Sequence, residues 1–311
     1  MNKILQKIDE AKHIVVVSHI NPDADSIGSA SAVYTHLLRL HKKVSFFCAT
    51  KEINQKLAFL PWFDKIRDSF PKSADLVISL DCANKDRIGI ECDCEIINID
   101  HHKSNTNYGD LNLVDAFSIS TTKVLYDFFM LNGISINKKM ATSLYAGLLD
   151  DSDAFLDDNV NGTTFAFAKE LIECGADYKL CNNYIKKYIT LGAFRLKGIM
   201  YKNMSLHCDA KVAVFLVDEN DMKASGAIEE DCEYVLEESL YLPSAKVALL
   251  LKLNSDLSIK GSLRSNSFDV SKIASFFGGG GHNTRAGFIV ASSMMQEEIK
   301  EKILKLICEE I

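Results

Sequence analysis

Short apolar runs that end in polar or acidic residues recur in the first hundred residues. The four runs are HIVVVS at 13–18, KVSFFC at 43–48, DLVISLD at 75–81 and EIINID at 95–100. Continuous runs of branched apolar residues are typical of strands buried on both faces of a parallel sheet. We therefore predict four strands, two of which place an aspartate, Asp81 or Asp100, at the carboxyl end.

Between and after these runs, apolar residues are spaced three or four apart, as on one face of a helix. This spacing covers residues 27–38, 121–131, 138–149 and 163–174. Strands that alternate with helices indicate a parallel sheet covered on both faces. In such a sheet a ligand binds beyond the carboxyl ends of the strands. The first half of the chain is therefore predicted to be a doubly wound, mostly parallel α/β domain.

The pattern of strands restarts after a mostly helical stretch at 176–204. The later apolar runs are at 211–217, 246–254, 258–265 and 286–291, and a helical pattern follows at 294–309. These elements predict a second, smaller α/β domain. We set the two domains at residues 1–180 and 206–311, joined by a helical linker at 181–205.

Composition narrows the class of protein. The chain has 311 residues, enough for two domains, and a formal net charge of −7 without a dense Lys/Arg run. A protein that tracks long nucleic acid needs a basic surface, so we expect a small anionic substrate instead. An acidic average does not exclude a local basic patch.

Targeting and redox signals indicate a cytoplasmic protein. No apolar span has transmembrane length, and the segment MNKILQKIDEAKH lacks the apolar core of a signal peptide. The nine cysteines form no CxxC pair, which argues against a zinc ribbon or a disulfide framework. We expect reduced thiols and no membrane association.

Acidic and histidine residues gather near the predicted strand ends. The candidate ligands are His19, Asp23, Asp25, Asp81, His101 and Asp151, with Asp100 and His102 beside His101. So many like charges at one edge of a sheet would repel unless a cation neutralised them. Carboxylates with imidazoles suit manganese, magnesium or iron, and six ligands are too many for one tetrahedral zinc. The residues therefore favour two divalent ions.

Four segments resemble, in order, the motifs of the DHH phosphoesterase superfamily. They are HINPDADSIGS, ISLD, DHH and AGLLDDSDAF. The segment GSLRSNSFDVSKIASFFGGGGHNTRAGF at 261–288 resembles the DHH-associated domain of one branch. The most similar branch is the bacterial oligoribonuclease (nanoRNase) and pAp phosphatase group.

This resemblance implies a role for each candidate in the first domain. His19 and Asp23 would hold one metal ion, Asp81 would bridge both ions, and Asp25, His101 and Asp151 would complete the second site. Asp100 would orient a ligand imidazole. His102, a catalytic candidate together with Asp81, would face the substrate phosphate and stabilise its charge or protonate the leaving group. Asp150 and Asp153 flank Asp151, and a different register would move this ligand.

The second domain carries a candidate phosphate site. Glycines allow backbone N–H groups to approach an anion closely, and arginine offers a planar fork suited to phosphate. By resemblance, the substrate-binding candidates are Arg264, Gly279, Gly280, Gly281, His282 and Arg285. Arg285 stands where the family commonly has alanine, so it either adds a phosphate contact or faces solvent.

The implied function is a two-metal phosphodiesterase and phosphatase. It would hydrolyse short oligoribonucleotides to mononucleotides and remove the 3′-phosphate of 3′-phosphoadenosine 5′-phosphate (pAp), with Mn²⁺ as the first choice of metal and Mg²⁺ or Co²⁺ as alternatives. The alternative hypotheses are that the protein is a cyclic or linear dinucleotide phosphodiesterase, a DHH pyrophosphatase or a non-catalytic nucleotide sensor. Expected partners are short RNA or mononucleotide bisphosphates, with no long nucleic acid. A homodimer is compatible with the sequence.

Overall fold

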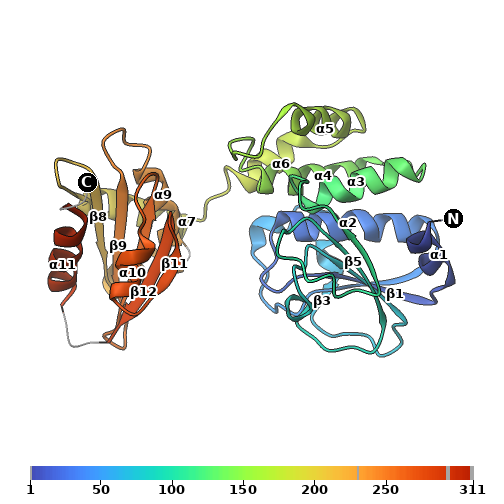
Figure 1. Ribbon diagram of the computed structural model, residues 1–311, viewed down its shortest axis with the longest axis horizontal. Coiled ribbons are helices and arrows are strands. Elements are labelled where there is room, and N and C mark those ends of the chain that lie inside the picture. The colour runs from blue at the N-terminus through green and yellow to red at the C-terminus, as the bar shows by residue number, and fades with distance from the viewer. Residues whose placement is uncertain (1, 230, 292–294, 309–311) are drawn as a thin grey trace. The chain divides into compact units, whose positions relative to one another are not determined.

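The chain divides into two compact units, Met1–Tyr188 and Ile189–Ile311 (Figure 1). The computed structural model describes residues 2–229, 231–291 and 295–308. Residues 181–205 do not form a separate body: helix α6 (Tyr178–Ile185) belongs to the first unit, and helix α7 (Leu191–Asn203) belongs to the second. The division therefore falls between these two helices.

The first unit is built on a six-stranded parallel sheet in the order β3-β2-β1-β4-β5-β6. Its strands are β1 (His13–Ser18), β2 (Lys43–Phe47), β3 (Ile66–Arg67), β4 (Leu76–Leu80), β5 (Glu95–Asp100) and β6 (Leu111–Val114). This order confirms the predicted doubly wound sheet. The direction of winding reverses between β1 and β4, where ligands bind in sheets of this kind. Strands β3 and β6 were not predicted, because runs of two and four residues are too short to show a pattern.

The α-helices of this unit pack on one face of the sheet. They are α1 (Lys3–Glu10), α2 (Ala24–Arg39), α3 (Thr121–Leu131) and α4 (Lys138–Asp151), with α5 (Gly162–Glu173) and α6 packed against α4 (Figure 1). On the other face, Val15, Val17 and Val77 meet Ile88 and Tyr108. Both faces are covered as predicted, but the second is covered by loops and the short 3₁₀ helix η3 (Lys85–Ile88).

Two glycines let α2 and α4 cross closely. A Cβ atom on Gly28 would lie 2.4 Å from the carbonyl oxygen of Ser143, and one on Gly147 would lie 2.5 Å from Oδ1 of Asp25. No side chain fits in that space without a shift of the backbone. The close crossing brings the first turn of α2 next to the last turns of α4.

The second unit has its own six-stranded sheet, in the order β11-β12-β10-β9-β8-β7. The strands are β7 (Ser205–His207), β8 (Val212–Val217), β9 (Val247–Leu253), β10 (Ile259–Ser265), β11 (Gly280–His282) and β12 (Arg285–Val290). Strands β8 and β9 are parallel, and the other neighbouring strands pair antiparallel. Helices α7 and α9 (Asp231–Ser239) contribute to the core on one face, and α10 (Ser271–Phe276) and α11 (Gln296–Cys308) to the core on the other. The predicted second α/β domain is therefore present, with α8 (Glu219–Ser225) against α7.

One disulfide corrects the expectation of fully reduced cysteines. Cys208 and Cys308 are bonded, which ties the turn after β7 to the end of α11. The two residues are 100 positions apart, so no short sequence motif could predict that they pair. The other seven cysteines are free thiols.

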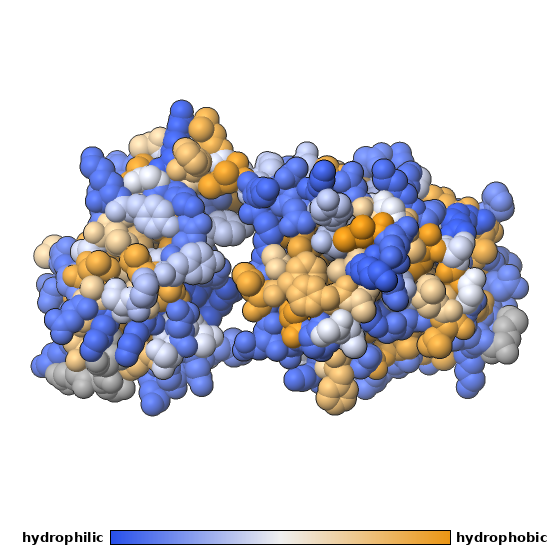
Figure 2. Space-filling view, turned by 90° about the horizontal axis from the view of Figure 1, so that it is seen from above, coloured by the Kyte–Doolittle hydropathy of each residue, from blue (hydrophilic) through white to orange (hydrophobic). Residues whose placement is uncertain are grey.

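Polar and charged side chains cover most of one face of the protein (Figure 2). Figure 2 shows one face, on which hydrophilic side chains predominate and apolar side chains are interspersed. Scattered exposed apolar residues are normal for a folded protein and do not mark an interface. Among the described residues, no helix has both the length and the apolar character needed to span a membrane.

Candidate metal centre

The first group of candidate ligands forms at the point where the sheet changes winding direction. His19 follows β1 and Asp81 follows the neighbouring strand β4. His19 Nε2 lies 3.3 Å from Asp81 Oδ2 and 3.5 Å from Asp23 Oδ2. Asp23 is the N-cap of α2, where its Oδ1 accepts a hydrogen bond of 2.9 Å from the Ser26 amide. Capping thus fixes one carboxylate oxygen and leaves the other facing His19.

A second group adjoins the first and shares Asp81. His101 Nε2 lies 3.1 Å from Asp151 Oδ2 and 3.7 Å from Asp81 Oδ1. One ligand atom from each of Asp25, His101 and Asp151 lies within 4.8 Å of the others, and the same holds for His19, Asp23 and Asp81. The two oxygens of Asp81 therefore face two different histidines, an arrangement suited to a bridging carboxylate.

Asp81 is held in a left-handed backbone conformation, with φ of 62°. This conformation is unfavourable for a residue other than glycine and persists only where neighbouring contacts impose it. Here the Asp81 amide donates to the Ile99 carbonyl at 3.0 Å, and the Thr121 hydroxyl donates to Asp81 Oδ1 at 2.8 Å. The strain turns the carboxylate from the strand end toward both histidines.

Asp25 connects helix α2 to the N-terminus of α3. Its carboxylate is fully buried and accepts hydrogen bonds from the backbone amides of Thr121 at 2.7 Å and Thr122 at 3.0 Å. These are the first residues of α3, where unpaired amides favour an anion. The two bonds fix the direction of the Asp25 side chain.

The charges at this edge are poorly balanced without a cation. Burial, reinforced by neighbouring carboxylates, raises the pKa of Asp25 and of Asp151 well above the ordinary value. Burial alone would lower the pKa of His19, but Asp23 and Asp81 raise it to about 10. Asp151 Oδ2 is buried and accepts no hydrogen bond. Crowded carboxylates and an orphaned oxygen fit the ligand set of divalent cations.

The structure distinguishes the three aspartates at and just beyond the end of α4. Asp150 Oδ2 accepts a hydrogen bond of 3.0 Å from the Ala24 amide at the start of α2. Asp153 forms an ion pair with Lys186. Asp151 is the one of the three that joins Asp25 and His101.

Asp100 bonds to the imidazole of His102 and to the backbone of His101. Its Oδ1 lies 2.7 Å from His102 Nδ1 and accepts from the backbone amide of His101 at 2.8 Å. The imidazole of His101 instead places Nδ1 3.3 Å from the Ser118 carbonyl. His102 Nδ1 also lies 3.6 Å from Asp81 Oδ1, so His102 stands at the rim of the cluster.

Three residues near the cluster were not predicted. Thr121 bonds to Asp81, Asn105 donates to Asp100 Oδ2 at 2.5 Å, and Arg87 Nη2 lies 2.8 Å from His19 Nδ1. Thr121 directly follows the SIS segment, and Asn105 directly follows the DHHKS segment. Their positions beside these motifs could have predicted that they lie near the candidate ligands. Arg87 lies in η3, whose sequence shows no recognisable pattern.

In the second unit, the cationic candidates form a row across three strands. Arg264 on β10 pairs in register with Arg285 on β12, which pairs with His282 on β11. Residues directly opposite in antiparallel strands share one face of the sheet. His282 and Arg285 are exposed.

The glycine run is partly explained by packing. A Cβ on Gly279 would lie 2.2 Å from the Gly287 carbonyl oxygen, and one on Gly281 would lie 2.5 Å from Ala286. Gly280 has open space. Close pairing of this segment with β12 therefore requires glycine at 279 and 281 whether or not an anion binds there.

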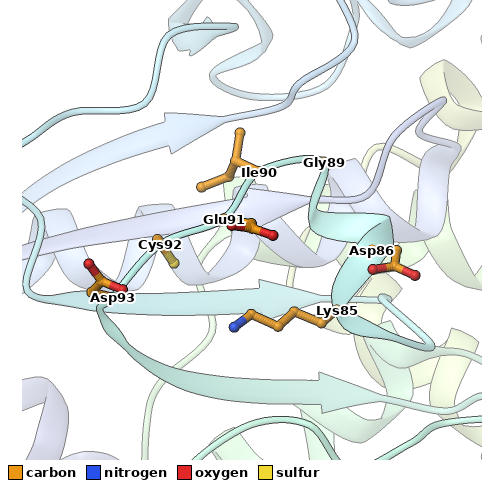
Figure 3. Close-up of a pocket in the computed structure, with 7 residues that line it drawn as sticks. All are labelled: Lys85, Asp86, Gly89, Ile90, Glu91, Cys92 and Asp93. Atoms are coloured by element: carbon orange, nitrogen blue, oxygen red, sulfur yellow. The ribbon is translucent and has the colours of Figure 1, made fainter.

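A pocket of about 660 Å³ lies outside the cluster (Figure 3). It is lined by residues of a single segment, Lys85–Asp93, which includes η3. None of the candidate ligands lines this pocket.

Comparison with known proteins agrees with the geometry. Residues 13–148 match the DHH family, N-terminal domain. The N-terminal unit is a DHH-family domain. Relatives named "Bifunctional oligoribonuclease and PAP phosphatase NrnA" match both the DHH domain and the second unit. The one from Bacillus subtilis is 28% identical, over 93% of each chain. The one from Thermus thermophilus is 27% identical, over 96% of this chain and 90% of its own.

The fold also matches a solved structure along nearly the whole chain. The crystal structure of an exopolyphosphatase-related protein from Bacteroides fragilis superposes with a TM-score of 0.84 at 23% identity. The match covers 99% of this chain and 96% of the other. The DHH domain and the second unit thus share the fold of that protein.

Proposed function

We propose that this chain is a metal-dependent phosphoesterase that hydrolyses short oligoribonucleotides to mononucleotides and removes the 3′-phosphate of pAp. The observation that carries the proposal is that the two oxygens of Asp81 face His19 and His101, one histidine from each set of ligands, beside the winding reversal of the sheet. Similarity to oligoribonuclease and PAP phosphatase relatives over both units supports the choice of substrate.

The ligand atoms fit a pair of divalent cations. His19 and Asp23 would hold one ion, Asp25, His101 and Asp151 would hold the other, and Asp81 would serve both. The set contains nitrogen and oxygen but no sulfur, which favours Mn²⁺, with Mg²⁺ or Co²⁺ as alternatives. When bound, such ions supply positive charge to the phosphoryl oxygens and lower the pKa of a water molecule.

His102 is proposed to act on the substrate phosphate. The hydrogen bond to Asp100 raises the pKa of His102, against the effect of burial. The side chain is 41% exposed and so can reach a substrate. A protonated imidazole held by Asp100 would donate to a phosphoryl oxygen and stabilise the charge that builds up there. Donation to the leaving oxygen is the second role open to it.

The second unit is proposed to bind a phosphate of the substrate. His282 and Arg285 lie exposed in the cationic row, and Arg264 lies beside them. Such a row offers several hydrogen-bond donors to a phosphate, which the net charge of −7 does not reveal. A few cations suit a short nucleotide rather than a long strand.

The proposed function is tested with a substrate panel. The full chain is incubated with Mn²⁺ and, separately, a dinucleotide, five-residue RNA, long RNA, pAp, a cyclic dinucleotide and pyrophosphate. We expect turnover of the dinucleotide, the short RNA and pAp, and little turnover of the others. Preference for the cyclic dinucleotide or for pyrophosphate would select one of the other phosphoesterase functions, and binding without turnover would indicate a sensor.

A pair of aspartate variants serves as the control for the panel. Asp81→Asn should abolish all turnover, while Asp86→Asn, an exposed carboxylate five residues away, should leave it unchanged. Full activity in Asp81→Asn would overturn the bridging role of Asp81.

A further inference from the structure

The two arginines of the candidate phosphate site, Arg264 and Arg285, pair with glutamates of helix α9. Glu233 and Glu237 are four residues apart on α9 and so project from the same side of this helix, and Glu229 lies just before the helix. Glu229 pairs with Lys252 and Lys260, which lie away from the candidate phosphate site. Glu233 and Glu237 pair with the two arginines of that site. The cations proposed to bind phosphate are thus already neutralised.

Two of the three guanidinium nitrogens of Arg264 donate hydrogen bonds within the fold. Its Nη2 donates to Glu233 at 2.5 Å, and its Nη1 donates to the Leu263 carbonyl at 2.9 Å. The third guanidinium nitrogen, Nε, is buried and makes no hydrogen bond. The Glu237 carboxylate lies 3.6 Å from this Nε, which is too far for a hydrogen bond.

Glu237 also neutralises Arg285. An Nη2 donor of Arg285 bonds to Oε1 of Glu237, the same oxygen that faces Arg264 Nε. One carboxylate oxygen therefore stands between the two arginines, where an anion bound by both would have to place an oxygen.

We infer that Glu237 competes with the substrate phosphate for Arg264 Nε and Arg285, and so sets the affinity of the second unit for its substrate. The inference rests on the proposed function. It assigns to this residue a role in substrate affinity: a phosphate binds only when the Glu237 side chain turns away.

Solvent exposure distinguishes the exchangeable Arg285–Glu237 pair from the structural Arg264–Glu233 pair. Arg285 and Glu237 are 62% and 44% exposed, whereas Arg264 and Glu233 are 11% and 28% exposed. An exposed ion pair is held weakly, and a dianionic phosphate can replace its carboxylate. The Glu233 bond to Arg264 is mostly buried, so breaking it would leave an unpaired charge. Glu233 therefore holds Arg264 in place while Glu237 is displaced.

The test compares two neighbouring glutamates of α9. Glu237→Gln removes the competing charge, and Glu238→Gln removes an equal charge that pairs with Lys197 and Tyr201 instead. Steady-state kinetics of the full chain with Mn²⁺ and pAp give KM and kcat for each variant. We expect Glu237→Gln to lower KM about three- to fivefold, the range of an exposed ion pair, with kcat within about twofold of wild type. Glu238→Gln should not change KM.

A double-variant cycle tests the mechanism. In an Arg285→Ala background, Glu237→Gln should lower KM by a smaller factor, because one of the two competing contacts is gone. A raised KM in Glu237→Gln would show that the carboxylate positions Arg285 for substrate, and an equal KM in the two Gln variants would show that Glu237 is irrelevant. Either result overturns this inference. Absence of pAp turnover by the wild-type chain would instead contradict the proposed function.

Discussion

At the scale of single residues, neighbouring aspartates at the end of α4 have different environments. Motif order in the sequence was enough to nominate Asp151, but it could not exclude Asp150 or Asp153. One position along a helix turns a side chain by about 100°, and the sequence does not record where the helix axis points. In the structure Asp150 caps α2, while Asp151 faces His101.

A pair of isosteric variants separates these two roles. Asp151→Asn should reduce turnover by more than about a hundredfold, since even residues that only support metal ligands cost 10- to 100-fold. Asp150→Asn should keep most of the activity and destabilise the protein by about 1 kcal/mol, because it weakens a cap. Activity assays and denaturant unfolding measure both effects. Loss of activity confined to Asp150→Asn would move the ligand to that residue.

The protonation of His19 predicts how metal affinity depends on pH. With its pKa raised to about 10, the metal-free imidazole holds a proton at pH 7. A histidine must lose that proton to bind a metal ion, so affinity should rise with pH between 6 and 8. Calorimetric titration of Mn²⁺ in two buffers of different ionisation enthalpy should show at least about one proton released per chain. His19→Gln should release about one proton fewer, and no release by the wild-type protein would contradict the assigned ligand.

At the scale of secondary-structure elements, strong periodic patterns were sufficient to predict an element and its bounds, whereas weak patterns were not. Residues 13–18 and 121–131 were predicted as β1 and α3 with the bounds that the structure shows. Strand β11 lies within the glycine run, where glycine hides any strand pattern. The close crossing of α2 and α4 could not be predicted either, because the contact of Gly28 with Ser143 joins residues far apart in the chain.

This crossing is tested with two helical glycines. Gly28→Ala should cost about 1–3 kcal/mol of unfolding free energy and weaken metal binding, because a new Cβ would press α4 away from Asp25. Gly198→Ala on α7 has open space and should be neutral or stabilising by up to about 1 kcal/mol. Thermal unfolding of both variants is the measurement. Equal stability of the two variants would show that the helices do not need this approach.

At the scale of the whole molecule, two separate cores were predictable from the restart of the strand pattern after residue 204. The place of division was not, because α6 and α7 follow one another in a single helical stretch and nothing in their sequences shows which core each joins. The pairing of Glu237 with Arg285 could not be predicted from the sequence either, because 48 residues separate them. Sequence motifs identify the chemistry, while charge pairing between distant elements depends on the fold.

The separate cores predict that the disulfide stabilises one unit only. Reduction of Cys208–Cys308 should lower the stability of the second unit by about 2–4 kcal/mol. The single tryptophan, Trp62, lies in the first unit, so its fluorescence midpoint in denaturant should not move. A shift of that midpoint on reduction would show that the two units unfold together.

The account depends most on the two ligand groups that share Asp81. Its most direct test is anomalous diffraction at the manganese edge from crystals of the full chain grown with Mn²⁺. We predict two peaks about 3.5–4 Å apart, one beside His19 and Asp23 and one beside His101 and Asp151, with Asp81 between them. An absence of peaks at this edge of the sheet in crystals that hold Mn²⁺ elsewhere would contradict the account.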